Sequence, residues 1–260
     1  MRTVYLALLT ACVAAAASVP EYALFDRVLQ RSVLDNGKVR YGQLRNDATL
    51  DRFVGQIASV SPDSNPALFP KREDKLAYWI NAYNALVLRS FATDYPDKRT
   101  RLRSLLGRAN FFYRIKHNVG GRMRSLDDIE VNSLRKPLHD PRIHFAIVCA
   151  SGSCPWLSRH AYTPENVNAK LDEEAKRYWA QARNFALDRA SHTVTLPAIL
   201  DWFKEDFGST PDKVLAFVAR YRPAEAADLT KRHVEYPLLR LRLVTQRCAV
   251  ICYSAAWYCL

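Results

Sequence analysis

Two cysteines and a histidine lie close together in the stretch Asp140–Pro155, which reads DPRIHFAIVCASGSCP. A cysteine thiolate attacks acyl and peptide-like carbonyls, and a histidine is the usual base for it. The residue pattern predicts a turn at Asp140-Pro141, a buried strand over Ile143–Cys149 and a small-residue loop that ends at Cys154. Cys154 could also begin a helix with Pro155 as its first residue, and helix-end N–H groups stabilise a thiolate. Cys154 is therefore the candidate nucleophile.

The spacing limits how these side chains can cooperate. On a regular strand His144 and Cys149 point to opposite faces and lie roughly 17 Å apart, at about 3.4 Å per residue. His144 can thus act as base or orienting group only where the strand is irregular. Cys149 and Cys154 are joined by a short loop and can approach each other, either as a disulfide or as a reactive thiol with a neighbour. Ser151 and Ser153 lie in this loop, whose N–H groups could bind an anion.

A second candidate group lies in the segment Lys75–Thr93, which contains YWINAYNAL. Its apolar residues recur at helical spacing, so it is predicted to be a helix packed into the core. Asn81 and Asn84 share another face of this helix and need hydrogen-bond partners there. They are either a satisfied polar patch in the core or a pair of amides that face the Cys154 pocket, orienting a substrate or holding an oxyanion.

Two charged residues precede the central stretch. Ser125 and Asp128 have the spacing of a capping box, which predicts a helix over Leu126–Lys136. Glu130 and Arg135 lie on this helix. Glu130 could orient His144, and Arg135 could bind a substrate carboxylate. A surface ion pair is the alternative for each.

The elements that must position these residues follow from periodicity and turn signals. Further helices are predicted over residues 22–33, 50–60, 163–182, 197–207 and 211–221, and β-hairpins over 111–125 and 184–196. The sum is α+β, a helix-rich single domain around a small, mainly antiparallel sheet.

Composition and charge limit the classes of partner that this chain is expected to bind. The chain has 260 residues, 49% of them hydrophobic, and a formal net charge of +12. Length and composition suit one globular domain with a full core. The basic residues are dispersed and no nucleic-acid motif is present, so we expect no nucleic-acid partner. No zinc-ligand spacing occurs, and we expect neither a metal nor a cofactor.

The first residues have the pattern of an export signal. Met1–Ser18 contains one arginine, an apolar run and an Ala-x-Ala pattern that ends at Ala17. We predict a signal peptide over residues 1–17, too short to span a membrane. Lipidation at Cys12 is the second interpretation. Either way the mature protein is expected to be periplasmic or secreted, where Cys149 and Cys154 can persist as a stabilising disulfide.

Three motifs in this order carry a family resemblance: YWINAYNAL at 78–86, SLDDIE at 125–130 followed by Arg135, and HFAIVCASGSCP at 144–155. Together they resemble the domain of unknown function 547 family, found in exported bacterial proteins and in plants, over roughly Val39 to Tyr236. The resemblance assigns no activity. It implies that Cys154, Cys149, His144 and the two asparagines line one pocket, and it suggests a papain-like or transglutaminase-like fold and a link to glutathione-handling proteins.

The family pattern fails at the end of the chain. Members of the family that this chain resembles usually finish on a strand bearing Tyr-Asp-Trp-Ser-Leu-Asn, which residues 237–260 lack. Codons for Leu241–Arg247 can be chosen that encode this motif when read one base later. We therefore take 18–236 as the domain and 237–260 as an aberrant tail, hypothetically produced by a frameshift, which the gene sequence would test.

Two functions from different classes follow. The first is an exported thiol-dependent hydrolase or acyl transferase that acts on a peptide-like or thiol-containing substrate through Cys154. The second is a non-catalytic binding module for a small anionic thiol or peptide, such as glutathione. A purely structural bridge between Cys149 and Cys154 is the remaining interpretation.

Overall fold

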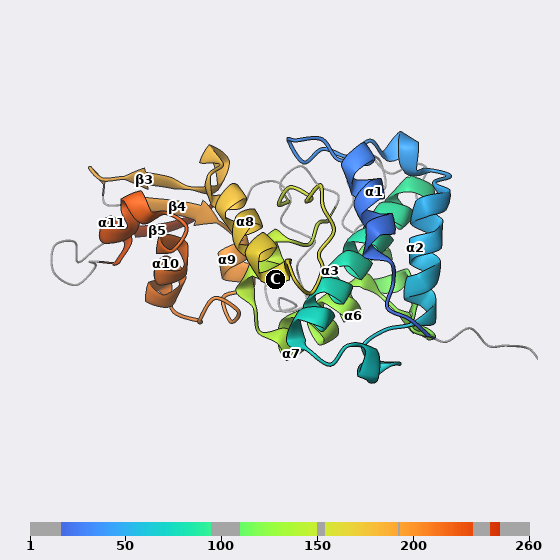
Figure 1. Cartoon of the computed structure of the whole chain (residues 1–260). Coiled ribbons are helices and arrows are strands. Elements are labelled where there is room, and N and C mark those ends of the chain that lie inside the picture. Colours follow the sequence, from blue (N-terminus) through green and yellow to red (C-terminus); the bar gives the residue numbers. More distant parts are fainter. Residues whose placement is uncertain (1–16, 95–109, 150–153, 192, 231–239, 245–260) are drawn as a thin grey trace, which may run out of the picture.

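The computed structural model describes residues 17–94, 110–149, 154–191, 193–230 and 240–244, the last of these by backbone alone. Residues 1–16 of the expected signal peptide, including Cys12, the loop serines Ser151 and Ser153, and most of the 237–260 tail lie outside these ranges. Two lobes are visible in Figure 1. We call them the N-terminal lobe, which lies within residues 22–138, and the C-terminal lobe, which lies within the described residues between 186 and 244.

Three helices form the frame of the N-terminal lobe: α1 (Tyr22–Ser32), α2 (Ala48–Ser59) and α3 (Arg72–Arg89). The Asp47 carboxylate caps α2 by accepting the N–H groups of Thr49 and Leu50, as expected for an N-cap aspartate. Every residue of α3 from Leu76 to Leu88 is buried. The predicted core helix is therefore confirmed, and it is enclosed on all sides.

A hairpin and a broken helix complete this lobe. Strands β1 (His117–Val119) and β2 (Arg122–Arg124) pair antiparallel around Gly120 and Gly121, both of which have positive φ. The Ser125 hydroxyl then accepts the N–H of Asp128, which confirms the predicted cap. The helix that follows has three parts: α6 (Leu126–Ile129), a π-helical turn (Glu130–Arg135) and α7 (Lys136–Leu138).

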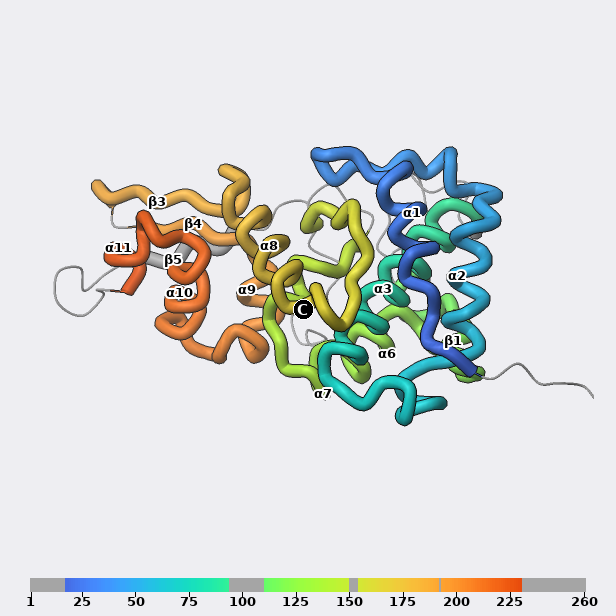
Figure 2. Tube along the Cα trace, viewed as in Figure 1, coloured from blue at the N-terminus to red at the C-terminus, as the bar shows by residue number. Residues whose placement is uncertain are grey.

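Helix α8 (Val167–Trp179) runs between the lobes (Figure 2). Its Val167 and Leu171 belong to the hydrophobic core of the N-terminal lobe, whereas Ala175, Tyr178 and Trp179 belong to that of the C-terminal lobe. The two cores therefore meet along one helix.

The C-terminal lobe combines a small sheet with short helices. Strands β3 (Ala186–Asp188) and β4 (Thr193–Pro197) form the predicted antiparallel hairpin, and β5 (Arg240–Val244), which lies in the tail, pairs parallel with β4. The helices are α9 (Ile199–Trp202), α10 (Pro211–Ala219) and α11 (Ala226–Thr230). Short 3-10 or π-helical turns lie at Tyr41–Leu44, Pro66–Leu68, Ser90–Asp94, Asn110–Arg114, Ala182–Asn184 and Pro223–Glu225. The chain is a helix-rich α+β structure, as expected.

The predicted strand over Ile143–Cys149 is wrong. The Asp140 carboxylate accepts the N–H of Arg142 and begins a 3-10 helix over Pro141–Phe145, and residues 147–149 then continue without a strand partner. The apolar residues of this run are buried, as a central strand would be, but their backbone is satisfied differently. The strand geometry that separated His144 from Cys149 therefore does not apply.

The helix expected to begin at Cys154 is also absent. Residues 154–163 have no helical turn, and α8 starts only at Val167. Cys154 therefore lies in a segment without regular secondary structure, and no helix begins at it. Within the described residues, no helix is both long and apolar enough to cross a membrane.

Candidate functional site

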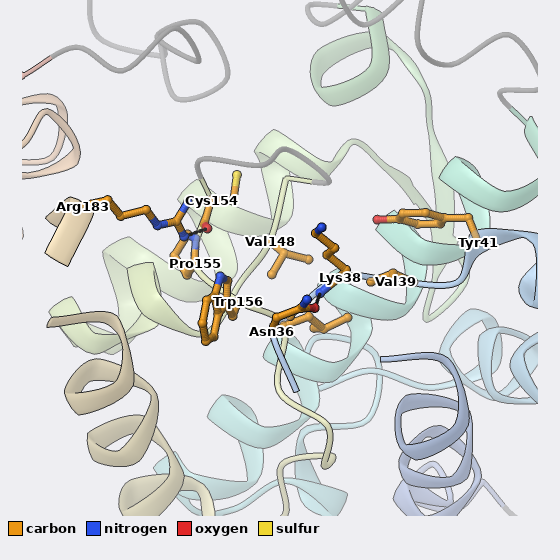
Figure 3. A pocket seen from close by; sticks show the side chains of 11 residues that line it. Asn36, Lys38, Val39, Tyr41, Val148, Cys154, Pro155, Trp156 and Arg183 are labelled. Carbon is orange, nitrogen blue, oxygen red and sulfur yellow. Dashed lines mark hydrogen bonds between the residues drawn. The ribbon is translucent and has the colours of Figure 1, made fainter. Parts of the chain in front are cut away.

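A cavity of about 560 Å³ opens beside Cys154. Figure 3 shows Cys154, Pro155 and Trp156 along one side and Asn36, Lys38 and Val39 along the other, with Tyr41 at one end. The two sides come from segments more than a hundred residues apart in the sequence. The lining residues are Asn36, Gly37, Lys38, Val39, Tyr41, Val148, Cys154, Pro155, Trp156, Leu157 and Arg183.

The first side is a tight turn after α1. Val33 and Val39 form an antiparallel bridge, and the Asn36 side chain accepts the N–H of Lys38 at 3.1 Å. Gly37 has a φ of +71°, and a Cβ atom there would lie only 2.4 Å from the Cβ of Trp156. Glycine is therefore required both by the turn and by the close approach of the opposite side.

The second side is held by arginines of the surrounding helices. Arg177 of α8 donates to the carbonyl of Trp156 at 2.8 Å, and its guanidinium lies 5.9 Å from the Trp156 ring centre. Arg183 donates to the carbonyl of Cys154 at 3.2 Å and lines the cavity itself. These bonds fix a segment that has no regular secondary structure of its own.

Cys149 and Cys154 form a disulfide, with their Cα atoms 6.2 Å apart. Both residues are partly buried. The predicted approach of the two thiols is thus confirmed. Only Cys154 belongs to the lining of the cavity, whereas Cys149 packs against the N-terminal core.

The charged side chains that line the cavity are all positive. Lys38 and Arg183 are its charged lining residues, and among the described residues that line it there is no carboxylate and no histidine. An anion would be attracted here, and a proton acceptor for a thiol is missing from the described lining. The described residues also contain no group of His, Cys, Asp or Glu side chains that could hold a metal ion.

Asn81 and Asn84 bind backbone, each with both ends of its amide. The Asn84 side chain donates to the carbonyl of Ala146 at 2.9 Å and accepts the N–H of Val148 at 3.1 Å. Asn81 does the same to the carbonyl and N–H of Tyr162, at 2.6 and 3.0 Å. Both residues thus form a hydrogen-bonded polar patch in the core, which is the first of the two interpretations. Asn84 still contributes to the site indirectly, because Val148 lines the cavity.

His144 lies at the junction of the lobes and does not line the cavity. Its Nε2 is 2.7 Å from a carboxylate oxygen of Asp206, and Arg135 donates to the same oxygen at 2.6 Å. The imidazole stacks on Phe203 with ring centres 4.2 Å apart. Burial lowers the pKa of His144, although Asp206 opposes this. A neutral imidazole must then donate from Nε2, because an ionised carboxylate only accepts.

The carboxylate that orients His144 is that of Asp206, whereas the sequence suggested Glu130 for this role. Burial by itself would raise the pKa of Asp206, but the hydrogen bonds from His144 and Arg135 outweigh it and hold the pKa below its usual value. Arg135 therefore pairs with Asp206, and its guanidinium lies 4.3 Å from the Phe203 ring centre. We call His144, Asp206, Arg135 and Glu130 the junction cluster.

Glu130 is the fourth member and accepts a hydrogen bond from the Tyr83 hydroxyl at 3.2 Å. Burial raises the pKa of Glu130 from 4.5 to about 7, against the attraction of Arg135. Between these values the folded protein holds a proton that the unfolded chain has lost. The free energy of unfolding is therefore highest below about pH 4.5, and it falls as the pH rises toward 7, because Glu130 loses its proton less readily in the folded state.

Replacing Glu130 with glutamine tests this titration. The variant cannot ionise at this position, so we expect it to be more stable than the wild type at pH 8, by about 1–3 kcal/mol, and nearly equal to it at pH 4. Urea unfolding at both pH values measures the difference. Glu205→Gln, at an exposed position, is the control and should show no such change. A wild type more stable than Glu130→Gln at pH 8 would contradict the assignment.

Several residues of the cavity and of the junction cluster were not predicted. Lys38, Trp156 and Arg183 come to the cavity through long-range packing, and Asp206 reaches His144 from the C-terminal lobe. One signal was available: Asn36-Gly37 is a common turn dipeptide, which indicates a turn at the first side of the cavity. Nothing in the sequence indicates that this turn touches the segment after Cys154.

Comparison with known proteins agrees with the resemblance seen in the sequence. Residues 68–179 match the model of a family described as "Protein of unknown function, DUF547". The matched segment runs from α3 to α8 and includes Asn81, Asn84, Glu130, Arg135, His144 and both bridged cysteines. No curated protein and no solved structure matches the chain.

Proposed function

Because the chain carries a DUF547 segment at residues 68–179 and that family's description gives no function, we propose a function from the site alone: the cavity beside Cys154 binds a small anionic peptide or thiol. Glutathione is an example of this class. The observation that carries the proposal is a cavity with two cationic side chains, an aromatic wall and a disulfide sulfur at its edge.

The size and surface of the cavity support a small ligand. Its volume of about 560 Å³ falls within the range of about 300–1,000 Å³ usual for ligand sites. Trp156, Tyr41 and Val39 offer apolar area for a peptide backbone or side chain. Polar groups are few, which is the usual composition of such a site.

The charges support an anionic ligand. Lys38 and Arg183 come from opposite sides of the cavity, so a ligand with two separated carboxylates could meet both. A guanidinium binds a carboxylate with directed N–H groups, and an ammonium acts as a point charge. A tripeptide such as glutathione has this arrangement of carboxylates.

The hydrolase or acyl-transferase hypothesis ranks second. It requires a free Cys154 thiolate, but this sulfur is bonded to Cys149. It also requires a base, and His144 is enclosed by Asp206, Phe203 and Phe207 at the lobe junction. Turnover would therefore need reduction of the bridge and a base from outside the described lining.

Export is part of the proposal. The predicted signal peptide would deliver the chain to the periplasm or the exterior, where an oxidising environment preserves disulfides. The Cys149–Cys154 bridge is the feature that such a compartment would keep.

Binding can be measured with S-methylglutathione, a peptide of this class whose sulfur is blocked. We expect saturable 1:1 binding to the folded protein by isothermal titration calorimetry. Lys38→Met should weaken the affinity about tenfold, the effect of losing one charge-assisted contact. Lys204→Met, at an exposed lysine outside the cavity, should change it less than about twofold, since a distant surface charge is screened.

Two outcomes would overturn the proposal. One is the absence of saturable binding to the wild type at millimolar peptide. The other is an equal loss of affinity in Lys38→Met and Lys204→Met, because general charge attraction alone would then explain the binding.

A further inference from the structure

We propose that a small anionic thiol exchanges with the disulfide beside the cavity by attacking one particular sulfur: the incoming thiolate bonds to Cys154, and Cys149 leaves. This inference rests on the proposed function, because it takes the cavity as the place where the thiol is held. It adds a covalent, redox step to what would otherwise be simple binding.

Access to the two sulfurs is unequal. Cys154 is part of the cavity lining, together with Pro155 and Trp156 (Figure 3). Cys149 follows the 3-10 helix Pro141–Phe145 and packs against the hydrophobic core of the N-terminal lobe. Thiol–disulfide exchange depends on which sulfur the thiolate can reach. A thiol held in the cavity reaches Cys154 first.

Charge also favours attack from the cavity. The attacking species is a thiolate, and Lys38 and Arg183 attract anions to the lining. No described carboxylate lines the cavity to repel it. Arg183 additionally donates to the Cys154 carbonyl at 3.2 Å, so the attacked residue and the cation are fixed relative to each other.

The step is balanced without another reactant. The thiolate sulfur forms a bond to Cys154 Sγ while the Cys154–Cys149 bond breaks, and its electron pair leaves on Cys149 Sγ as a thiolate. The ligand sulfur is oxidised to a mixed disulfide and Cys149 is reduced. Return attack by Cys149 on Cys154 Sγ releases the ligand, so the mixed disulfide persists only where Cys149 is trapped.

The experiment exposes the full-length oxidised protein briefly to reduced glutathione and then to excess N-ethylmaleimide. Non-reducing peptide mapping by mass spectrometry then locates each group. We expect glutathione on Cys154 and ethylmaleimide on Cys149, at least about tenfold above the opposite distribution. Lys38→Met should form this product about threefold to tenfold more slowly than Lys204→Met, through the weaker local attraction for the thiolate. S-methylglutathione, titrated in parallel, reports binding without exchange.

The outcomes separate this inference from the proposed function. Glutathione on Cys149, or equal distribution between the cysteines, would overturn the claim that the thiolate attacks Cys154. Binding of S-methylglutathione without any glutathione adduct would overturn the exchange and leave the binding function standing. An adduct on Cys154 without binding of S-methylglutathione would overturn the proposed function, and with it the claim that the cavity directs the attack.

Discussion

Replacing Asn84 with leucine should lower the free energy of unfolding by about 2–6 kcal/mol. Leucine has the same branched shape and number of side-chain heavy atoms as asparagine but cannot hydrogen bond, so the carbonyl of Ala146 and the N–H of Val148 would lose their partner. Each buried backbone group left unpaired costs about 1–3 kcal/mol. Asn84 is itself buried, and water therefore cannot easily take over its role.

Chemical denaturation of the variant and the wild type measures this loss. Asn132→Ala is a control, because Asn132 is an exposed asparagine whose side chain donates to the Asp128 side chain. It should cost less than about 0.5 kcal/mol, as surface changes usually do. The affinity for S-methylglutathione should fall in Asn84→Leu as well, because Val148 lines the cavity. A destabilisation below about 1 kcal/mol would show that the two backbone groups find other partners.

A second large loss of unfolding free energy is expected when Asp206 of the junction cluster is replaced. Asp206→Ala would leave the Arg135 guanidinium and the His144 Nε2–H without their shared carboxylate. Removing one partner of a largely buried ion pair typically costs about 3–5 kcal/mol. Arg135 and Asp206 are both partly exposed, so we expect the lower part of this range at pH 7, about 3 kcal/mol.

The pH dependence of this effect has a definite sign. The folded state holds the pKa of Asp206 below its usual value of 3.8. A carboxylate of this kind contributes stability that is fully present above about pH 4 and is lost as the pH falls further. The gap between Asp206→Ala and the wild type should therefore narrow in acid.

Urea unfolding at pH 7 and pH 3 measures the gap. Asp201→Ala, which removes an exposed carboxylate on α9, is the control and should show a small effect at both values. A gap that stays constant or widens in acid would mean that ionisation of Asp206 is not what stabilises the junction.

Several elements of the N-terminal lobe could be predicted because their signals are local. The apolar spacing of α3, the Ser125 cap and the Gly120-Gly121 turn each fix the backbone within a few residues. The run Ile143–Cys149 could not be assigned in this way. A short buried apolar segment reads like a central strand, and here the partner that replaces a strand is the Asn84 side chain of a distant helix.

The site was only half predictable for the same reason. Cys149 and Cys154 were found from their type and spacing, and the structure joins them. Lys38 and Trp156 were missed, because only the tertiary fold brings the turn at Gly37 against the segment after Cys154. His144 was found but paired with the wrong carboxylate, since Asp206 belongs to the other lobe.

The central claim is that the cavity beside Cys154 is a binding site for a small anionic peptide. A crystal structure of the oxidised protein grown with S-methylglutathione tests it most directly. We predict electron density for the peptide against Trp156, with its carboxylates within hydrogen-bonding distance of Lys38 and Arg183. Density for the peptide at another place, or an unaltered cavity at a peptide concentration that saturates calorimetry, would contradict the claim.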